Sequence, residues 1–188
     1  MATINDFSQN MSTTPKIERH PLQPTQLRRN MTKILFICHG NICRSPMAEF
    51  IMKQLVEQAG RASDFEIASA AVSTEEIGND IYPPAKRMLA SKGVPFEHRA
   101  ARQMTRADYA YYDHIVCMDQ SNLRWLRYII GEDSDHKVSL LKQWSNDQIN
   151  DKMVNDKMVN ISDPWYTGDF TKAYDDILEG CQGMLQQI

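Results

Sequence analysis

The chain has 188 residues, of which 42% are hydrophobic and 24% charged, a balance typical of a single globular domain. Its net charge of -3 gives no electrostatic reason to expect a nucleic acid or an anionic membrane as partner. No apolar run approaches the roughly 20 residues that a membrane span needs, and no secretory signal is visible. Four cysteines are too few for a disulfide scaffold, so we expect a reducing compartment, the cytoplasm.

Residues 1–30 show neither helical nor strand periodicity and contain three prolines. We interpret this segment as a disordered extension and residues 31–188 as the folded domain. Further along, the five residues Asp151–Asn155 are copied word for word at 156–160. The copy matches no helix period and no solenoid repeat, so we interpret it as a tolerated duplication in a surface loop.

The remaining pattern alternates short apolar runs with helical periodicity. Residues 34–37 form a continuous apolar run, typical of a strand buried on both faces. Ser45 and Pro46 then suit the N-cap and first position of a helix that ends at Gly60. Further strands are expected at 65–70, 114–118 and 138–140, and further helices at 84–91, 105–112, 122–130 and 170–188. This alternation predicts an α/β fold of three layers, a four-stranded parallel sheet with helices on both faces.

The segment between the first strand and the first helix carries the chemistry. Cys38 and Arg44 are spaced as Cys-x5-Arg, which is weak evidence alone, but here the loop enters a helix N-terminus. Its backbone N–H groups can therefore converge on an anion, and Gly40 and Asn41 tolerate the positive φ that a concave loop needs. The helix end and the neighbouring arginine favour a Cys38 thiolate as nucleophile, and Arg44 can hold two phosphate oxygens at once.

The string from Ile37 to Pro46, Ile-Cys-His-Gly-Asn-Ile-Cys-Arg-Ser-Pro, resembles the signature of the low-molecular-weight protein tyrosine phosphatases. The resemblance runs from about Lys33 to the C-terminal helix. It implies a metal-independent enzyme without cofactor, which hydrolyses phosphotyrosine in proteins through a phosphocysteine at Cys38. The phosphate-binding loop that it implies consists of His39, Gly40, Asn41, Ile42, Cys43, Arg44 and Ser45. It predicts no particular oligomeric state.

A second motif, Asp163-Pro164-Trp165-Tyr166, resembles the acid loop of that family. Asp163 matches the general acid, which protonates the leaving phenol and then activates water. Trp165 and Tyr166 match the aromatic pair that walls the cleft. Glu75 stands where many relatives carry another aromatic wall residue, which suggests attraction to basic residues near the phosphosite.

Four residues align with positions that brace the phosphate loop by hydrogen bonds in the family: Asn41, Ser69, His98 and Asp119. Ser69 and Asp119 also suit ordinary caps of a strand or helix, and His98 also suits an ordinary surface residue. His98 lies one residue further from Thr105 than the family spacing has it, which puts its position in doubt.

Several other readings compete with a tyrosine phosphatase. Arsenate reductases share the fold and relay a disulfide through further cysteines, but Cys117 and Cys181 fall in a buried strand and the last helix. Phosphoarginine phosphatases carry threonine where this chain has Ile42. An inactive phosphate-binding module would be expected to lack a catalytic residue. A zinc site at Cys38, His39 and Cys43 lacks a second ligand pair, and we expect Cys43 instead to protect an oxidised Cys38 by forming a disulfide.

Overall fold

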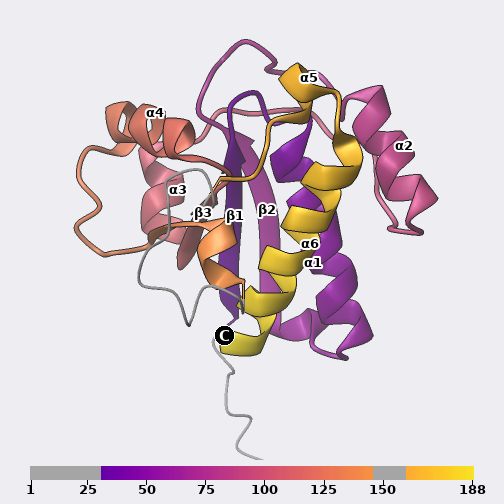
Figure 1. Ribbon diagram of the computed structural model, residues 1–188. Helices are drawn as coiled ribbons and strands as arrows, with labels where there is room; N and C mark the ends of the chain where they lie inside the picture. Colours follow the sequence, from indigo (N-terminus) through magenta and orange to yellow (C-terminus); the bar gives the residue numbers. More distant parts are fainter. Residues whose placement is uncertain (1–30, 146–159) are drawn as a thin grey trace, which may run out of the picture.

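The computed structural model describes residues 31–145 and 160–188 (Figure 1). The expected N-terminal extension and nearly all of the duplicated segment lie outside these ranges. The described strands form one parallel sheet in the order β2-β1-β3-β4. They are β1 (Thr32–Cys38), β2 (Phe65–Ala71), β3 (His114–Cys117) and β4 (Val138–Leu140). The expected four-stranded parallel sheet is confirmed.

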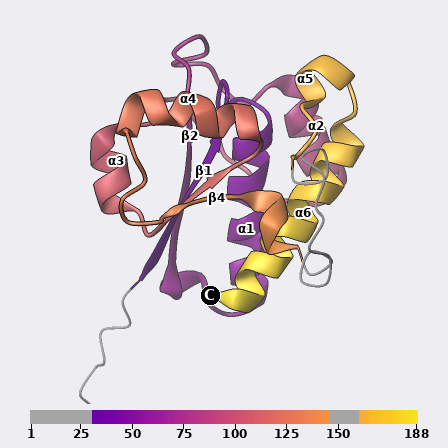
Figure 2. The same cartoon turned by 60° about the vertical axis from the view of Figure 1, so that its left-hand side comes forward.

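Helices cover both faces of this sheet, as the turned view in Figure 2 shows. On one face lie α1 (Arg44–Gln58), α2 (Pro83–Ser91) and α6 (Phe170–Gln187). The other face carries α3 (Arg106–Tyr111) and α4 (Gln120–Ile130). Three short helical turns complete the described chain: η1 (Ala62–Asp64), η2 (Leu141–Trp144) and α5 (Pro164–Thr167). Within the described ranges, no helix combines the length and the apolar character that crossing a membrane requires.

Strand β1 runs through the middle of the hydrophobic core, and its side chains alternate between the two faces. Ile34 and Phe36 pack in the cluster under α1 and α6, whereas Leu35 and Ile37 pack in the cluster under α3 and α4. All four are fully buried, and each such burial contributes about 1.5–3 kcal/mol. The carboxyl end of β1, at Cys38, is therefore held by packing on both sides.

Helix α6 packs so closely on η2 that its glycines are required. A Cβ atom on Gly183 would lie 1.9 Å from the carbonyl oxygen of Trp144, a distance that no side chain allows. Beyond the undescribed residues, the chain is again fixed at Ile161, which is buried and donates its N–H to the carbonyl of Met118 at 2.8 Å. The two described ends of this connection are thus both anchored to the core.

Candidate active site

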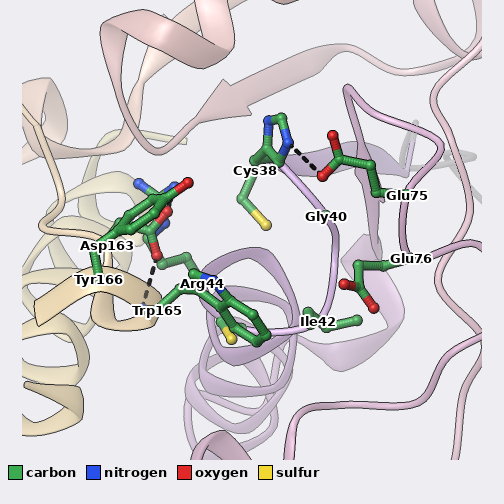
Figure 3. A pocket seen from close by; sticks show the side chains of 11 residues that line it. Cys38, Gly40, Ile42, Arg44, Glu75, Glu76, Asp163, Trp165 and Tyr166 are labelled. Carbon is green, nitrogen blue, oxygen red and sulfur yellow. Dashed lines mark hydrogen bonds and ion pairs between the residues drawn. The ribbon is translucent and has the colours of Figure 1, made fainter. Parts of the chain in front are cut away.

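A pocket opens at the carboxyl ends of the strands, where open parallel sheets usually bind ligands. Its floor is the loop from Cys38 to Arg44, and two further segments form its sides. Figure 3 shows Glu75 and Glu76 on one side of the Cys38 sulfur and Asp163 and Tyr166 on the other. Strand β1 presents the loop, the segment after β2 presents the two glutamates, and α5 presents the opposite side.

Helix α1 begins two residues earlier than expected, at Arg44, with Cys43 in the N-cap position. The prediction of Ser45 as N-cap is therefore wrong: among residues 31–145 and 160–188 no side chain caps this helix, and the Ser45 hydroxyl lies 3.0 Å from the Cys38 sulfur instead. Because helix N-terminal N–H groups lack partners within the helix, an uncapped end leaves them available to an anion.

The loop reaches its concave shape through Asn41, whose φ is 60°, whereas Gly40 is not in the left-handed region. Gly40 instead allows a close approach, since a Cβ atom there would lie 2.9 Å from the Cγ of Glu76 and this side chain would have to shift. The expected role of Gly40 in supplying positive φ is therefore wrong, and that of Asn41 agrees with the structure.

Hydrogen-bond donors surround the Cys38 sulfur. The backbone N–H of Asn41 donates to Sγ at 3.3 Å, and the Ser45 hydroxyl contacts it at 3.0 Å. The side-chain amide of Asn41 donates to the hydroxyls of Ser45, at 2.8 Å, and of Ser69, at 2.9 Å. These contacts fix the position of the sulfur at the centre of the loop.

Arg44 is almost fully buried and connects the loop to two carboxylates. Its Nη1 donates to Asp119 at 2.5 Å and to the carbonyl of Ile161 at 3.1 Å, and its Nη2 donates to Asp163 at 2.5 Å. Burial alone would lower the pKa of Arg44, but the negative charges of Cys38 and then Asp163 raise it above its ordinary value. The guanidinium therefore stays charged beside the sulfur.

Asp163 owes its position to the short helix that follows it. One carboxylate oxygen accepts the backbone N–H of Trp165 at 3.0 Å, which caps α5, and the other faces Arg44. Pro164 occupies the first position of that helix, where its missing N–H costs nothing. The carboxyl group is thus held at the side of the pocket opposite Glu75.

The mouth of the pocket is much more exposed than its floor. Tyr166 is 83% exposed, and half-exposed Trp165 packs its ring 5.0 Å from that of Tyr82. The side chain of Glu75 is 69% exposed and lies 3.0 Å from Nε2 of His39. A planar aromatic group can therefore enter between an aromatic side and an acidic side.

The other cysteines differ from Cys38 in their surroundings. Burial, and next the charge of Cys38, raise the pKa of Cys43, which keeps this neighbour a neutral thiol. Burial also raises the pKa of Cys117 and of Cys181, and both are fully buried in the core. Neither lines the pocket, so the geometry offers no path for a disulfide relay to the loop. Protection of Cys38 by Cys43 stays a prediction.

Comparison with known proteins identifies the family. The model of the low molecular weight phosphotyrosine protein phosphatases matches residues 33–188. This chain belongs to that family. It is 33% identical to low molecular weight protein-tyrosine-phosphatase YfkJ of Bacillus subtilis, an alignment covering 84% of this chain and 96% of that protein. The rat low molecular weight phosphotyrosine protein phosphatase is 36% identical, with coverages of 82% and 94%.

Solved structures support the same assignment of the fold. The crystal structure of YfkJ superimposes with a TM-score of 0.76 at 32% identity, covering 84% of this chain and 94% of that one. A Drosophila protein described as an arginine phosphatase has a TM-score of 0.71 at 30% identity, covering 83% and 97%. The three-layer architecture of this phosphatase is therefore that of its relatives.

The expectation for His98 is wrong. Its side chain is 82% exposed and lies 3.8 Å from the carboxylate of Asp80 rather than against the phosphate loop. The next residue, Arg99, reaches the loop instead and donates to the backbone carbonyl and the side-chain oxygen of Asn41. The one-residue offset before Thr105 was the signal in the sequence, because it allows the following residue to take the inward position.

The other two expected bracing residues lie next to the loop. Ser69 accepts the Asn41 amide and donates to Glu49 at 2.6 Å. Asp119 binds Arg44 and also caps α4 by accepting the N–H of Asn122 at 2.7 Å, so it combines the two alternatives that the sequence left open. Sequence reasoning did not identify Glu49, because a glutamate in a helix is usually exposed.

Proposed function

We propose that this phosphatase hydrolyses phosphotyrosine in proteins, with Cys38 as nucleophile, Arg44 as phosphate ligand and Asp163 as general acid and base. The observation that carries the proposal is the position of the Cys38 sulfur, surrounded by donors from Asn41 and Ser45 and flanked by the Arg44–Asp163 pair. Family membership and the names of the relatives support the same reaction.

In the first step the Cys38 thiolate attacks phosphorus, a sulfur–phosphorus bond forms, and the bond from phosphorus to the phenolic oxygen breaks. Asp163 gives its proton to that oxygen, because a phenol, with a pKa of about 10, leaves much more easily than its anion. The loop N–H groups and Arg44 hold the non-bridging oxygens and stabilise the charge that develops on them. The phosphoryl group competes with Asp163 for Nη2 of Arg44, so binding frees the carboxyl group to face the leaving oxygen.

In the second step water attacks the phosphocysteine, the sulfur–phosphorus bond breaks, and inorganic phosphate and the thiolate are released. Asp163, now a carboxylate, takes a proton from the attacking water. The Ser45 hydroxyl, 3.0 Å from the sulfur, donates to the thiolate as it leaves. Both half-reactions therefore use the same groups in the same positions.

The pocket supports an aromatic phosphoester as substrate. Trp165 and Tyr166 offer their rings at the mouth, and a phosphoserine side chain is too short to contact them while its phosphate lies on the loop. Phosphoarginine is the second candidate, because one relative is described as an arginine phosphatase and because the Glu75 and Glu76 side chains at the mouth suit a guanidinium. Ile42, which lines the pocket, favours the aryl group over the polar one.

We place the reaction in the cytoplasm, because a catalytic thiolate beside a second cysteine needs a reducing compartment to stay reduced. All four cysteines, which lie in the described ranges, are free.

The test is hydrolysis of p-nitrophenyl phosphate in the presence of EDTA by the wild type, Cys38→Ser and Asp163→Ala. We expect turnover that Cys38→Ser abolishes and that Asp163→Ala slows by about 10²–10⁴-fold. A reduced, folded wild type without turnover would refute the proposal. Matched peptides with phosphotyrosine, phosphoserine or phosphoarginine then decide the substrate, and faster cleavage of phosphoarginine would favour the second candidate.

A further inference from the structure

Arg99 lies beneath the phosphate loop rather than in the pocket. It comes from the connection between α2 and α3, and its side chain is 13% exposed. In the described part of the chain, the residues that line the pocket do not include Arg99. The phosphate loop lies between Arg99 and the pocket. Its guanidinium therefore approaches the loop from the side opposite to the substrate.

Two nitrogens of the Arg99 guanidinium donate hydrogen bonds to Asn41. Nη1 donates to the backbone carbonyl of Asn41 at 2.9 Å, and Nη2 donates to the Asn41 side-chain oxygen at 2.7 Å and to the carbonyl of Ser69 at 3.2 Å. Asn41 is the loop residue with φ of 60°, a conformation that costs energy in any residue other than glycine. A planar fork is the donor that can hold both oxygens of this residue at once.

Asn41 in turn determines the surroundings of the sulfur. Its backbone N–H donates to Cys38, and its side-chain amide holds the Ser45 hydroxyl that contacts the same sulfur. A hydrogen-bonded chain thus runs from Arg99 through Asn41 and Ser45 to Cys38. If the guanidinium is lost, Asn41 can rotate its amide and release Ser45.

Charge acts along the same path. Nε of Arg99 lies 3.7 Å from buried Glu49, which Lys53 also contacts at 2.6 Å, so the three side chains together carry one positive charge. Burial lowers the pKa of Arg99, and the charges of Glu49 and then of Cys38 act in the opposite direction. The ordinary value for arginine is so high that the group stays charged at neutral pH.

We propose that Arg99 is a positioning residue of the phosphatase, which locks Asn41 in its left-handed conformation and supplies a fixed positive charge behind the Cys38 thiolate. It touches neither substrate nor phosphorus. The proposal rests on the proposed function for its kinetic part only, since the state of the sulfur can be measured without turnover.

The first experiment measures the alkylation of Cys38 by iodoacetamide as a function of pH in the wild type, Arg99→Gln and Arg99→Lys. Loss of the charge in Arg99→Gln should move the curve to higher pH, by about one unit, and so lower the rate on its acid limb by about tenfold. Arg99→Lys keeps the charge but loses the fork, so its curve should move by less than that of Arg99→Gln. Arg87→Gln, which removes an exposed arginine from α2, is the matched control and should keep the wild-type curve.

The second experiment uses the kinetics of p-nitrophenyl phosphate hydrolysis to separate the effect of the hydrogen bonds from Arg99 to Asn41 from the effect of the charge. Arg99→Lys loses the fork, so we expect kcat to fall by about tenfold while KM changes by less than about threefold. If Arg99→Lys keeps the wild-type kcat, the proposal that Arg99 positions Asn41 through its two hydrogen bonds is wrong. If the wild type shows no turnover while the alkylation curve of Arg99→Gln still moves, the proposed function fails and the charge effect stands.

Glu49→Gln tests the direction in which charge shifts the Cys38 alkylation curve, and this test does not depend on whether Arg99→Gln folds. Removing this carboxylate leaves Arg99 and Lys53 uncompensated, and the amide oxygen of glutamine can still accept the Ser69 hydroxyl. The alkylation curve should then move to lower pH, opposite to the shift in Arg99→Gln. A curve that coincides with the wild type in Glu49→Gln, or that moves upward, would overturn the charge effect.

Discussion

The floor and the mouth of the active site are built in opposite ways. In the floor, the phosphate loop is buried and its polar groups are paired with Ser69, Asp119 and Arg99. At the mouth, Glu75 and Tyr166 expose most of their surface and make few contacts. The difference suggests that the floor holds the geometry of the reaction before substrate arrives, whereas the mouth can adapt to it. Changes in the floor should therefore lower kcat, and changes at the mouth should alter selectivity.

The largest effect is expected from Arg44→Lys, which breaks the floor while keeping its charge. A lysine cannot contact Asp119 and Asp163 together while holding two phosphate oxygens, so kcat/KM should fall by about 10³-fold. Steady-state kinetics with p-nitrophenyl phosphate measures this loss, and Arg87→Lys on the surface of α2 is the control. A loss of less than about tenfold would mean that charge alone is sufficient.

Asp163→Asn should have the next largest effect, and its size should depend on the leaving group. Asparagine keeps the acceptor for the Trp165 N–H but has no acidic proton to give. With phenyl phosphate kcat should fall by about 10²–10³-fold, and with p-nitrophenyl phosphate by less, because that phenolate leaves more easily. Equal losses on both esters would show that Asp163 does not protonate the leaving group.

A smaller effect is expected at the mouth from Glu75→Gln. Matched phosphotyrosine peptides with flanking lysines or flanking glutamates should differ in kcat/KM, and the substitution should reduce this preference for lysine by about threefold. Because the Glu75 side chain is 69% exposed, added salt should remove the preference in the wild type as well. If the wild type cleaves the two peptides equally at low salt, the proposed attraction is absent.

The smallest effect is expected from Asp80→Asn, in the outer support of the floor. Partial burial raises the pKa of Asp80, but hydrogen bonds from Lys86 and from the N–H groups of Ile81 and Arg99 outweigh it and hold the pKa at about 2. Since this folded-state pKa lies below the ordinary value of 3.8, the carboxylate stabilises the fold above that value and less so as pH falls towards 2.

Urea unfolding measures the stability of Asp80→Asn. The variant should be less stable than the wild type by about 1 kcal/mol at neutral pH, and the gap should narrow below about pH 4. A gap that is constant with pH would show that the negative charge of Asp80 is not its cause.

The sequence was informative where local chemistry decides the structure. The buried strand at 34–37, the helix expected at 105–112 and the cap at Asp119 depend on residues close in the chain, and each lies where its pattern indicates. The start of α1 was misjudged because Ser45 is an ordinary N-cap residue by type. In the fold, the Ser45 hydroxyl accepts the Asn41 amide and contacts the Cys38 sulfur, and these partners lie there only once the loop has closed.

The residues that support the phosphate loop from below were harder to predict from the sequence. Arg99 is far in sequence from both Asn41 and Glu49, and it meets them only because the connection before α3 packs under the phosphate loop and α1. The sequence does not show whether His98 or Arg99 points inward. That choice depends on the register of this segment, in which the backbone N–H of Arg99 donates to the carboxylate of Asp80. Such long-range choices cannot be read from local patterns.

The described residues on either side of 146–159 are anchored to the core, which bears on what a change in the number of copies of the duplicated segment would do. The second copy ends at Asn160, whose side chain accepts the N–H of Gln120 at 2.9 Å, and the first copy ends in the same residue, Asn155. Deleting one copy therefore leaves an identical Asn-Ile-Ser-Asp-Pro string leading to Asp163. We therefore expect a variant that carries one copy to keep the sequence that anchors Asp163, and with it the wild-type activity on p-nitrophenyl phosphate.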